Sequence, residues 1–244
     1  MALDVPAAVA ELEAGFRAVA TPERAAREKR YLKSDLTFIG ATVWQTSDVV
    51  KPFAKSRSFE HDDLVALVEA LWAAPIFERR MAATMLLELH PKVLGSADLP
   101  LVERLIRESL TWALVDALAT DVVAGIRKAD PSVEPVLDRW ATDPDFWVRR
   151  ASLLAELRSL KAGADMRPFL RRADRMLDEK EFFIRKAIGW VLREVGKKRP
   201  DEVIAWLAPR TGRTSGVTVR EAVRYLPEAE RDRLMAAYRE HRAA

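Results

Sequence analysis

A few side chains whose types suit charge stabilisation recur in this sequence at nearly constant spacing. Trp112 lies four residues before Asp116, so the two side chains are neighbours if this segment is helical. Arg150 and Lys186 follow Asp116 at intervals of 34 and 36 residues. A carboxylate stabilises a cation that develops during a reaction, indole faces attract cations, and Arg and Lys bind phosphates without reading a base sequence. The spacing therefore favours a site for a cationic substrate that carries phosphate groups.

The elements that must position these side chains are predicted to be helices. A short phrase recurs in the chain, as Val148-Arg149-Arg150-Ala151, Ile184-Arg185-Lys186-Ala187 and Val219-Arg220-Glu221-Ala222. Its alanines share one register with Ala82 and Ala117, at intervals of 35, 34, 36 and 35 residues. A period of this size, with apolar residues at helical spacing throughout, is typical of stacked helical repeats.

Each repeat also contains an earlier helix that ends in a large apolar residue. These residues keep the same step and are Trp72, Ile106, Trp140 and Met176. Pairs of helices of this kind stack into a solenoid with a concave face that binds partners. The predicted fold class is therefore all-α, a HEAT-like helical-repeat solenoid with a concave binding groove.

The predicted organisation is a single helical-repeat domain over residues 1–244. Residues 1–60 fit the repeat register poorly and are expected to form an N-terminal helical cap, residues 61–230 form the repeats, and residues 231–244 form a C-terminal tail. Asp143 and Pro144 offer an N-cap and a first-turn proline, and Pro200 opens another helix. Three glycines are expected in connections, namely Gly95, Gly163 and Gly212.

Helical geometry separates a buried stripe from a second face in two of the predicted helices. Around Ala187 the buried stripe contains Ile184, Ala187, Ile188, Val191 and Val195, whereas Trp190 lies on the other side with Lys186 and Arg193. Around Ala117 the stripe contains Leu110, Leu114, Ala117 and Leu118, whereas Trp112 and Asp116 lie opposite. Trp190 packs against a neighbouring repeat or forms an exposed aromatic surface among cations. Asp116 forms a salt bridge between repeats or supplies the carboxylate of a groove.

Composition narrows the classes of function. The chain has no cysteine and three scattered histidines, so no metal site and no cysteine chemistry are predicted. The first 20 residues do not resemble a secretory signal, and no apolar run approaches a membrane span, so a cytoplasmic location is expected. Residues 145–199 hold 15 Lys and Arg against 8 Asp and Glu, whereas residues 1–144 hold 17 against 22. This local excess of positive charge indicates either a solvated surface or a nucleic-acid phosphate site.

One reaction suits these groups. A purine alkylated at N3 or N7 is cationic and leaves readily, so cleavage of its glycosidic bond needs no general acid. Positive charge then develops on the sugar, where a carboxylate stabilises it and orients the attacking water. Asp116 is the candidate carboxylate, and Trp112 and Trp190 are the candidate aromatic faces.

The chain resembles the AlkD-type DNA alkylation repair glycosylases, which are built of HEAT-like repeats. The most specific stretch of this resemblance is Glu181-Phe-Phe-Ile-Arg-Lys-Ala-Ile-Gly-Trp-Val-Leu-Arg-Glu194. Further segments are similar in the same order, and these are Arg30-Tyr31-Leu32-Lys33, Leu71-Trp72 and Phe146-Trp-Val-Arg-Arg-Ala151. The resemblance covers residues 10 to 230, with departures from the family pattern at Thr111 and Ala113.

The resemblance implies a base excision repair hydrolase that removes N3- and N7-alkylated purines, such as 3-methyladenine and 7-methylguanine, from duplex DNA without a cofactor. It implies catalytic roles for Asp116 and Trp112, and DNA-binding roles for Arg150, Trp190 and Tyr31. Lys186 and Arg193 flank Trp190 and are predicted to bind DNA as well.

Two other interpretations stay open at this point. Helical-repeat proteins often bind protein partners, so the chain is alternatively a scaffold without enzymatic activity. It is also alternatively a protein that binds DNA structures without catalysis. For the glycosylase itself, the expected partner is duplex DNA with alkylated purines, and a monomer in the cytoplasm is expected, associated with the nucleoid when DNA is bound.

Overall fold

The repeat period corresponds to pairs of helices in the computed structural model, which describes residues 3–243. The chain divides into two compact units between Asp130 and Pro131, and each unit is considered by itself. The helices of the first unit are α1 (Val5–Val19), α2 (Pro22–Leu32), α3 (Val43–Lys55), α4 (His61–Trp72), α5 (Phe77–Leu89), α6 (Leu99–Arg107), α7 (Trp112–Ala117) and α8 (Ala124–Ala129). A 3₁₀ turn, Ser96–Asp98, precedes α6, and a π-helical segment, Leu118–Val123, joins α7 to α8.

The second unit continues the same pattern of helix pairs. Its helices are α9 (Glu134–Trp140), α10 (Phe146–Leu154), α11 (Leu157–Lys161), α12 (Arg167–Arg175), α13 (Phe182–Gly196), α14 (Pro200–Leu207), α15 (Gly216–Ala222) and α16 (Glu228–Ala243). Short 3₁₀ turns occur at Pro131–Val133, Ala208–Arg210 and Val223–Tyr225. Residues 3–243 contain no β-strand, only an isolated parallel bridge between Thr37 and Ile76. The predicted all-α helical-repeat fold is therefore confirmed.

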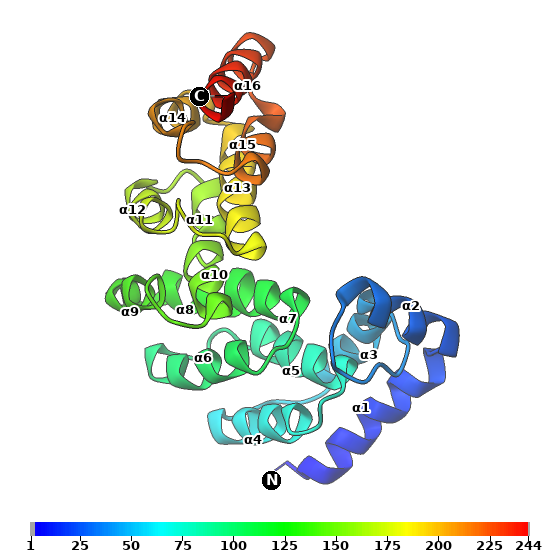
Figure 1. Ribbon diagram of the computed structural model, residues 1–244. Helices are drawn as coiled ribbons and strands as arrows, with labels where there is room; N and C mark the ends of the chain where they lie inside the picture. Colours follow the sequence, from blue (N-terminus) through cyan, green and yellow to red (C-terminus); the bar gives the residue numbers. More distant parts are fainter. Residues whose placement is uncertain (1–2, 244) are drawn as a thin grey trace. The chain divides into compact units, whose positions relative to one another are not determined.

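Within each unit, the second helices of the pairs lie next to one another. In the first unit α5 packs against α7, and in the second unit α13 packs against both α10 and α15 (Figure 1). The alanines of the repeat register lie at these contacts, since Ala82, Ala151, Ala187 and Ala222 are fully buried. The large apolar residues that end the first helices are buried too, as the sequence predicts. The concave groove of the whole stack and the single-domain organisation stay predictions.

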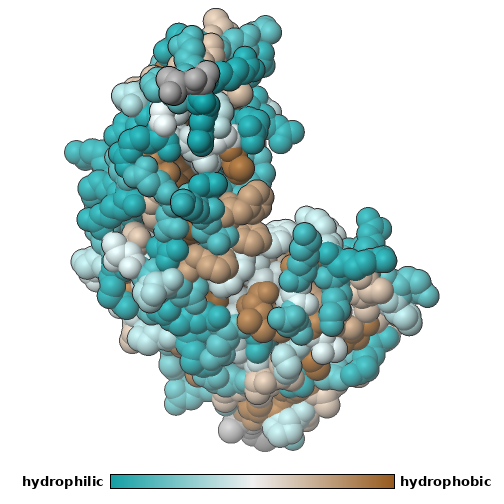
Figure 2. All heavy atoms as spheres, in the orientation of Figure 1, coloured by the Kyte–Doolittle hydropathy of each residue, from teal (hydrophilic) through white to brown (hydrophobic). Residues whose placement is uncertain are grey.

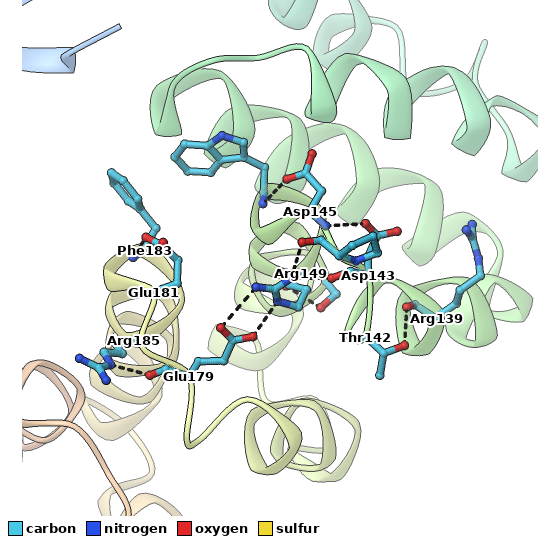
Figure 3. Close-up of polar contacts among 12 residues, drawn as sticks. Arg139, Thr142, Asp143, Asp145, Arg149, Glu179, Glu181, Phe183 and Arg185 are labelled. Atoms are coloured by element: carbon cyan, nitrogen blue, oxygen red, sulfur yellow. Dashed lines mark hydrogen bonds and ion pairs between the residues drawn. The ribbon is translucent and has the colours of Figure 1, made fainter.

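The two consecutive charged residues of the recurring phrase make different kinds of contact. The first position ties the helix to the turn before it, because Arg149 and Arg185 each donate to a carbonyl six residues earlier, at 2.5 and 2.6 Å (Figure 3). The second position reaches the next repeat, because Arg150 donates to the carbonyl of Phe183 and Lys186 pairs with Glu221. The charged residues of the phrase therefore connect neighbouring repeats, and their spacing also reveals the repeat period.

The N-caps of α10 and α13 are equivalent acidic residues (Figure 3). Asp145 accepts a hydrogen bond from the backbone N–H of Trp147 at 2.8 Å, and Glu181 accepts one from that of Phe183 at 3.2 Å. The prediction that Asp143 caps α10 is therefore wrong. Asp143 instead accepts from the backbone N–H of Asp145, so it shapes the turn before the cap.

Ion pairs at the repeat spacing also connect neighbouring helix pairs. Each joins residues 34 to 36 positions apart, and they are Glu69–Arg104, Asp138–Arg172, Asp174–Arg210, Asp178–Arg213 and Lys186–Glu221. Most of these pairs are partly exposed, and exposed ion pairs contribute little stability. The spacing of these ion pairs follows the repeat period, whereas the burial of apolar residues provides most of the stability of the repeats. Hydrophilic residues cover most of the visible surface of each unit (Figure 2).

Within residues 3–243, every helix falls short of the length and apolar character that a membrane-spanning helix needs.

Replacing Gly189 by Ala is expected to weaken the contact between α13 and α15. A Cβ at this position would lie 2.6 Å from the Cβ of Glu221 and 3.0 Å from the carbonyl oxygen of Thr218. Neither atom is the end of a flexible side chain, so the helices must separate, at a cost of about 1–3 kcal/mol in the free energy of unfolding. Chemical denaturation measures this cost.

Gly125 provides the matched control, since it also lies within a helix but a Cβ there meets nothing within 4 Å. Gly125→Ala is expected to stabilise the protein by about 0.5–1 kcal/mol, because alanine is the better helix former. Equal stability of the two variants would contradict the close approach of α13 and α15.

Candidate functional site

Two aromatic side chains of the predicted site meet in the first unit. The ring of Tyr31, near the end of α2, contacts the ring of Trp112 edge-to-face, with centroids 5.9 Å apart and an interplanar angle of 82°. Tyr31 is 68% exposed, whereas Trp112 is half-buried. Aromatic pairs of this geometry hold each other in place, so the structure brings these two predicted residues into contact.

Asp116 lies one helical turn beyond Trp112 on α7, which makes the two side chains neighbours. Its exposed fraction is 9%, so this carboxylate is mostly buried. The helix begins with Thr111 as N-cap, and this residue is itself buried. Asp116 is therefore held at a fixed place on a short, capped helix.

The backbone on both sides of α7 departs from regular helix. Leu110, which precedes the cap, has a φ of 54° and is 48% exposed, so its predicted place on the buried stripe is wrong. Leu114 and Leu118 of that stripe are fully buried, and Ala117 is partly buried. The π-helical segment begins two residues after Asp116, and residues 3–243 contain no other. Such segments frequently occur at functional sites.

Glu78 positions Tyr31 relative to Trp112, although it is not part of the predicted site. Its fully buried carboxylate accepts hydrogen bonds from the backbone N–H groups of Ile39, Gly40 and Ala41, at 2.9, 2.7 and 3.2 Å. This anchors the segment that follows α2 to the start of α5, and α5 packs against α7. The stacked rings of Phe38 and Phe77, 5.1 Å apart, support the same contact.

Arg150 belongs to the second unit and is only 3% exposed. Its guanidinium donates to the carbonyl of Phe183 and lies 5.8 Å from the centroid of that ring. Arg150 therefore joins α10 to α13, and its contact with a DNA phosphate stays a prediction.

Lys186 and Arg193, two other predicted DNA ligands, meet at one carboxylate of α15. Lys186 Nζ pairs with Glu221 Oε1, and Arg193 Nη1 pairs with Glu221 Oε2. Burial favours the protonated form of Glu221, but the hydrogen bonds and charges of Lys186 and Arg193 outweigh it, so its pKa lies below the ordinary value. Glu221 occupies the second charged position of the third phrase, which is the signal that could have identified it as the partner of these cations.

Trp190 lies on α13 between Lys186 and Arg193 and is half-buried. The rest of α13 follows the predicted pattern, since Ile184, Ala187, Ile188, Val191 and Val195 are buried. The second unit thus places one indole between two cations on a single helix, as expected from the helical wheel.

The predicted residues therefore form two groups, one in each unit. Tyr31, Trp112 and Asp116 make an aromatic and acidic group in the first unit, and Arg150, Lys186, Trp190 and Arg193 make a basic group in the second. Within residues 3–243, no three His, Cys, Asp or Glu side chains are grouped in a way that could hold a metal ion.

Comparison with known proteins gives one family and several similar folds. A family model described as DNA alkylation repair enzyme matches residues 12–226. A predicted DNA alkylation repair enzyme from Enterococcus faecalis has a similar structure, with a TM-score of 0.78 and 23% identity over 86% of this chain and 97% of that one. AlkD2 from Streptococcus mutans is similar with a TM-score of 0.66 and 17% identity over 91% of this chain and 99% of that one.

At these identities the solved structures establish the fold, and a search of curated proteins finds no match. The family model covers most of the chain, including every residue of the predicted site. The chain belongs to the DNA alkylation repair enzyme family.

Proposed function

We propose that this protein is a DNA glycosylase that excises positively charged N3- and N7-alkylated purines from duplex DNA. The observation that carries the proposal is the contact of Tyr31 with Trp112, one helical turn from the mostly buried carboxylate of Asp116. Aromatic faces and a carboxylate together suit a substrate on which positive charge develops.

In the proposed reaction, the bond between C1′ of the sugar and the purine nitrogen breaks. Its electron pair moves to the alkylated purine, which leaves as a neutral base, and positive charge develops on the sugar. Asp116 stabilises this charge and accepts a hydrogen bond from a water molecule. The water oxygen then bonds to C1′ and its proton passes to solvent, which leaves an abasic site. No cofactor takes part.

The basic group of the second unit supports the binding part of the proposal. Lys186, Arg193 and Arg150 would hold phosphates of the DNA backbone, and Trp190 would contact the DNA beside them. Residues 145–199 carry the excess of positive charge that this binding needs. The proposed partner is duplex DNA bound by a monomer, and the proposed location is the cytoplasm, at the nucleoid when DNA is bound.

A base-release assay tests the proposal directly. The purified protein is incubated with duplex DNA methylated by a simple alkylating agent, and released bases are separated by chromatography. Release of 3-methyladenine or 7-methylguanine, without added metal and in the presence of a chelator, is the expected result. Salt-dependent DNA binding without release would instead identify a non-catalytic DNA-binding protein, and neither binding nor release would identify a protein-binding scaffold.

A further inference from the structure

One face of α13 continues beyond the predicted DNA-binding residues. Lys186, Trp190, Arg193 and Lys197 follow one another at steps of four, three and four residues, which places them on one stripe of the helix. Lys197 is the C-cap residue of α13, still in helical conformation, and its side chain is 41% exposed. The stripe therefore leads from the proposed site to the C-terminal end of α13.

Three lysines surround one carboxylate at that end of the helix. Lys161, Lys197 and Lys198 line a pocket of about 250 Å³ together with Glu194. The Nζ of Lys197 lies 2.8 and 2.9 Å from the two carboxylate oxygens, and that of Lys161 lies 3.8 Å from one of them. The pocket is lined by these three lysines and Arg199 against one carboxylate, so its lining carries an excess of three positive charges. We call these three lysines the terminal lysine cluster.

The wall of the pocket is fixed by Arg199. Its guanidinium donates to the carbonyls of Leu160 and Ala164, at 2.7 and 2.9 Å, and so ties the end of α13 to the connection that follows α11. The Nζ of Lys198 contacts the carbonyl of Lys161 at 3.5 Å, a long and weak contact. The hydrogen bonds of Arg199 therefore fix the backbone beside the cluster, and the ammonium group of Lys198 is available for a ligand.

An exposed aromatic ring borders the cluster. Tyr225 is 50% exposed, and the Nζ of Lys197 lies 4.8 Å from the centroid of its ring. Cations at helix C-termini are common, because they interact favourably with the helix dipole, which accounts for Lys161 and Lys197 individually. That effect does not account for three lysines in one pocket beside an exposed ring, an arrangement typical of surfaces that bind a nucleic-acid backbone.

We infer that the terminal lysine cluster is a second phosphate-binding site for the backbone of duplex DNA, separate from the proposed catalytic group. The inference rests on the proposed function because it takes duplex DNA as the ligand. From Lys186 to Lys197 the helix rises about 16 Å, so the cluster lies apart from Lys186 along α13. The cluster thus binds DNA that flanks the lesion and adds affinity without reading sequence.

The salt dependence of DNA binding tests this inference. A triple variant, Lys161→Gln, Lys197→Gln and Lys198→Gln, is compared with the wild type for binding of undamaged duplex DNA at several salt concentrations. Each phosphate contact contributes about 0.9 to the slope of log K against log salt, so the magnitude of the slope is expected to fall by about 2–3. A matched control, Lys51→Gln, Lys55→Gln and Lys92→Gln, removes three exposed lysines of the first unit and is expected to keep the wild-type slope.

Equal slopes in the cluster variant and the wild type, or an equal decrease in both triple variants, would overturn the inference. Base release by the wild type is measured in parallel and reports on the proposed function separately from the salt slope. If the wild type releases no base while the slope still falls in the cluster variant alone, the proposed function fails and the DNA-binding site stands. If the wild type releases base but the slope is unchanged in the cluster variant, the proposed function stands and the second DNA-binding site is refuted.

Discussion

Replacing Asp116 by Asn is expected to lower the rate of base release by a factor of about 10²–10³, the usual effect of removing one group that stabilises developing charge. Asparagine has nearly the same size and still accepts a hydrogen bond, but it lacks the negative charge that opposes the charge on the sugar. Single-turnover release of 7-methylguanine from methylated duplex DNA measures the effect, and duplex affinity is expected to stay close to that of the wild type.

Asp35→Asn is the matched control, because Asp35 lies in the same unit and is exposed. It is expected to keep the wild-type rate. Thermal unfolding of both variants separates a catalytic loss from a loss of fold. Wild-type activity in Asp116→Asn would contradict the proposed mechanism while leaving the family assignment and the fold unchanged.

The repeat period predicted the architecture because its physical basis lies in the sequence itself. A small residue such as Ala187 is required where two helices pack closely, and charged partners must recur at the same interval to meet across that contact. The same logic placed Lys186 and Arg193 on one face of α13. The same register also contains the signal for their shared partner, because the third phrase has an acidic residue, Glu221, where the other two have a cation.

The N-terminal part of the site was harder to predict, because it depends on contacts between segments far apart in the chain. Tyr31 meets Trp112 beside a segment that the carboxylate of Glu78 and the stacked rings of Phe38 and Phe77 anchor to α5. The repeat period cannot predict this contact, because it relates only residues at equivalent positions of successive repeats. The alternation of buried and exposed residues from Leu32 to Phe38 is the local signal of this extended segment.

The cap of α10 shows a different limit. Asp143 and Asp145 both suit an N-cap, and a proline between them favours the earlier one, yet the structure uses the later residue. Arg149 donates to the carbonyl of Asp143, a contact that is compatible with Asp143 in the turn before the helix. Tertiary contacts of this kind move a helix boundary by one or two residues.

Arg172→Ala is expected to destabilise the protein more than any other substitution considered above, by about 3–5 kcal/mol in the free energy of unfolding. The Arg172 side chain is fully buried in the second unit, where it pairs with Asp138 at 2.8 Å, with Glu134 at 2.5 Å and with the fully buried Glu156. Its removal leaves the Glu156 carboxylate inside the protein without this countercharge, and a buried charge that has lost its partner is costly. Chemical denaturation monitored by circular dichroism measures the loss.

The neighbouring Arg171 provides the control, since it is exposed on the same helix, and Arg171→Ala is expected to change stability by no more than about 0.5 kcal/mol. A double variant, Arg172→Met with Glu156→Gln, removes both buried charges and is expected to recover part of the loss, because a neutral side chain at position 156 avoids the cost of a buried carboxylate whose ion pair with Arg172 has been removed. If Arg172→Ala and Arg171→Ala were equally stable, the buried ion cluster could not be what joins α9 and α12 to the connection between α10 and α11. Recovery in the double variant would show that the cost of Arg172→Ala comes from the lost ion pair with the buried Glu156 carboxylate rather than from the lost volume of the arginine.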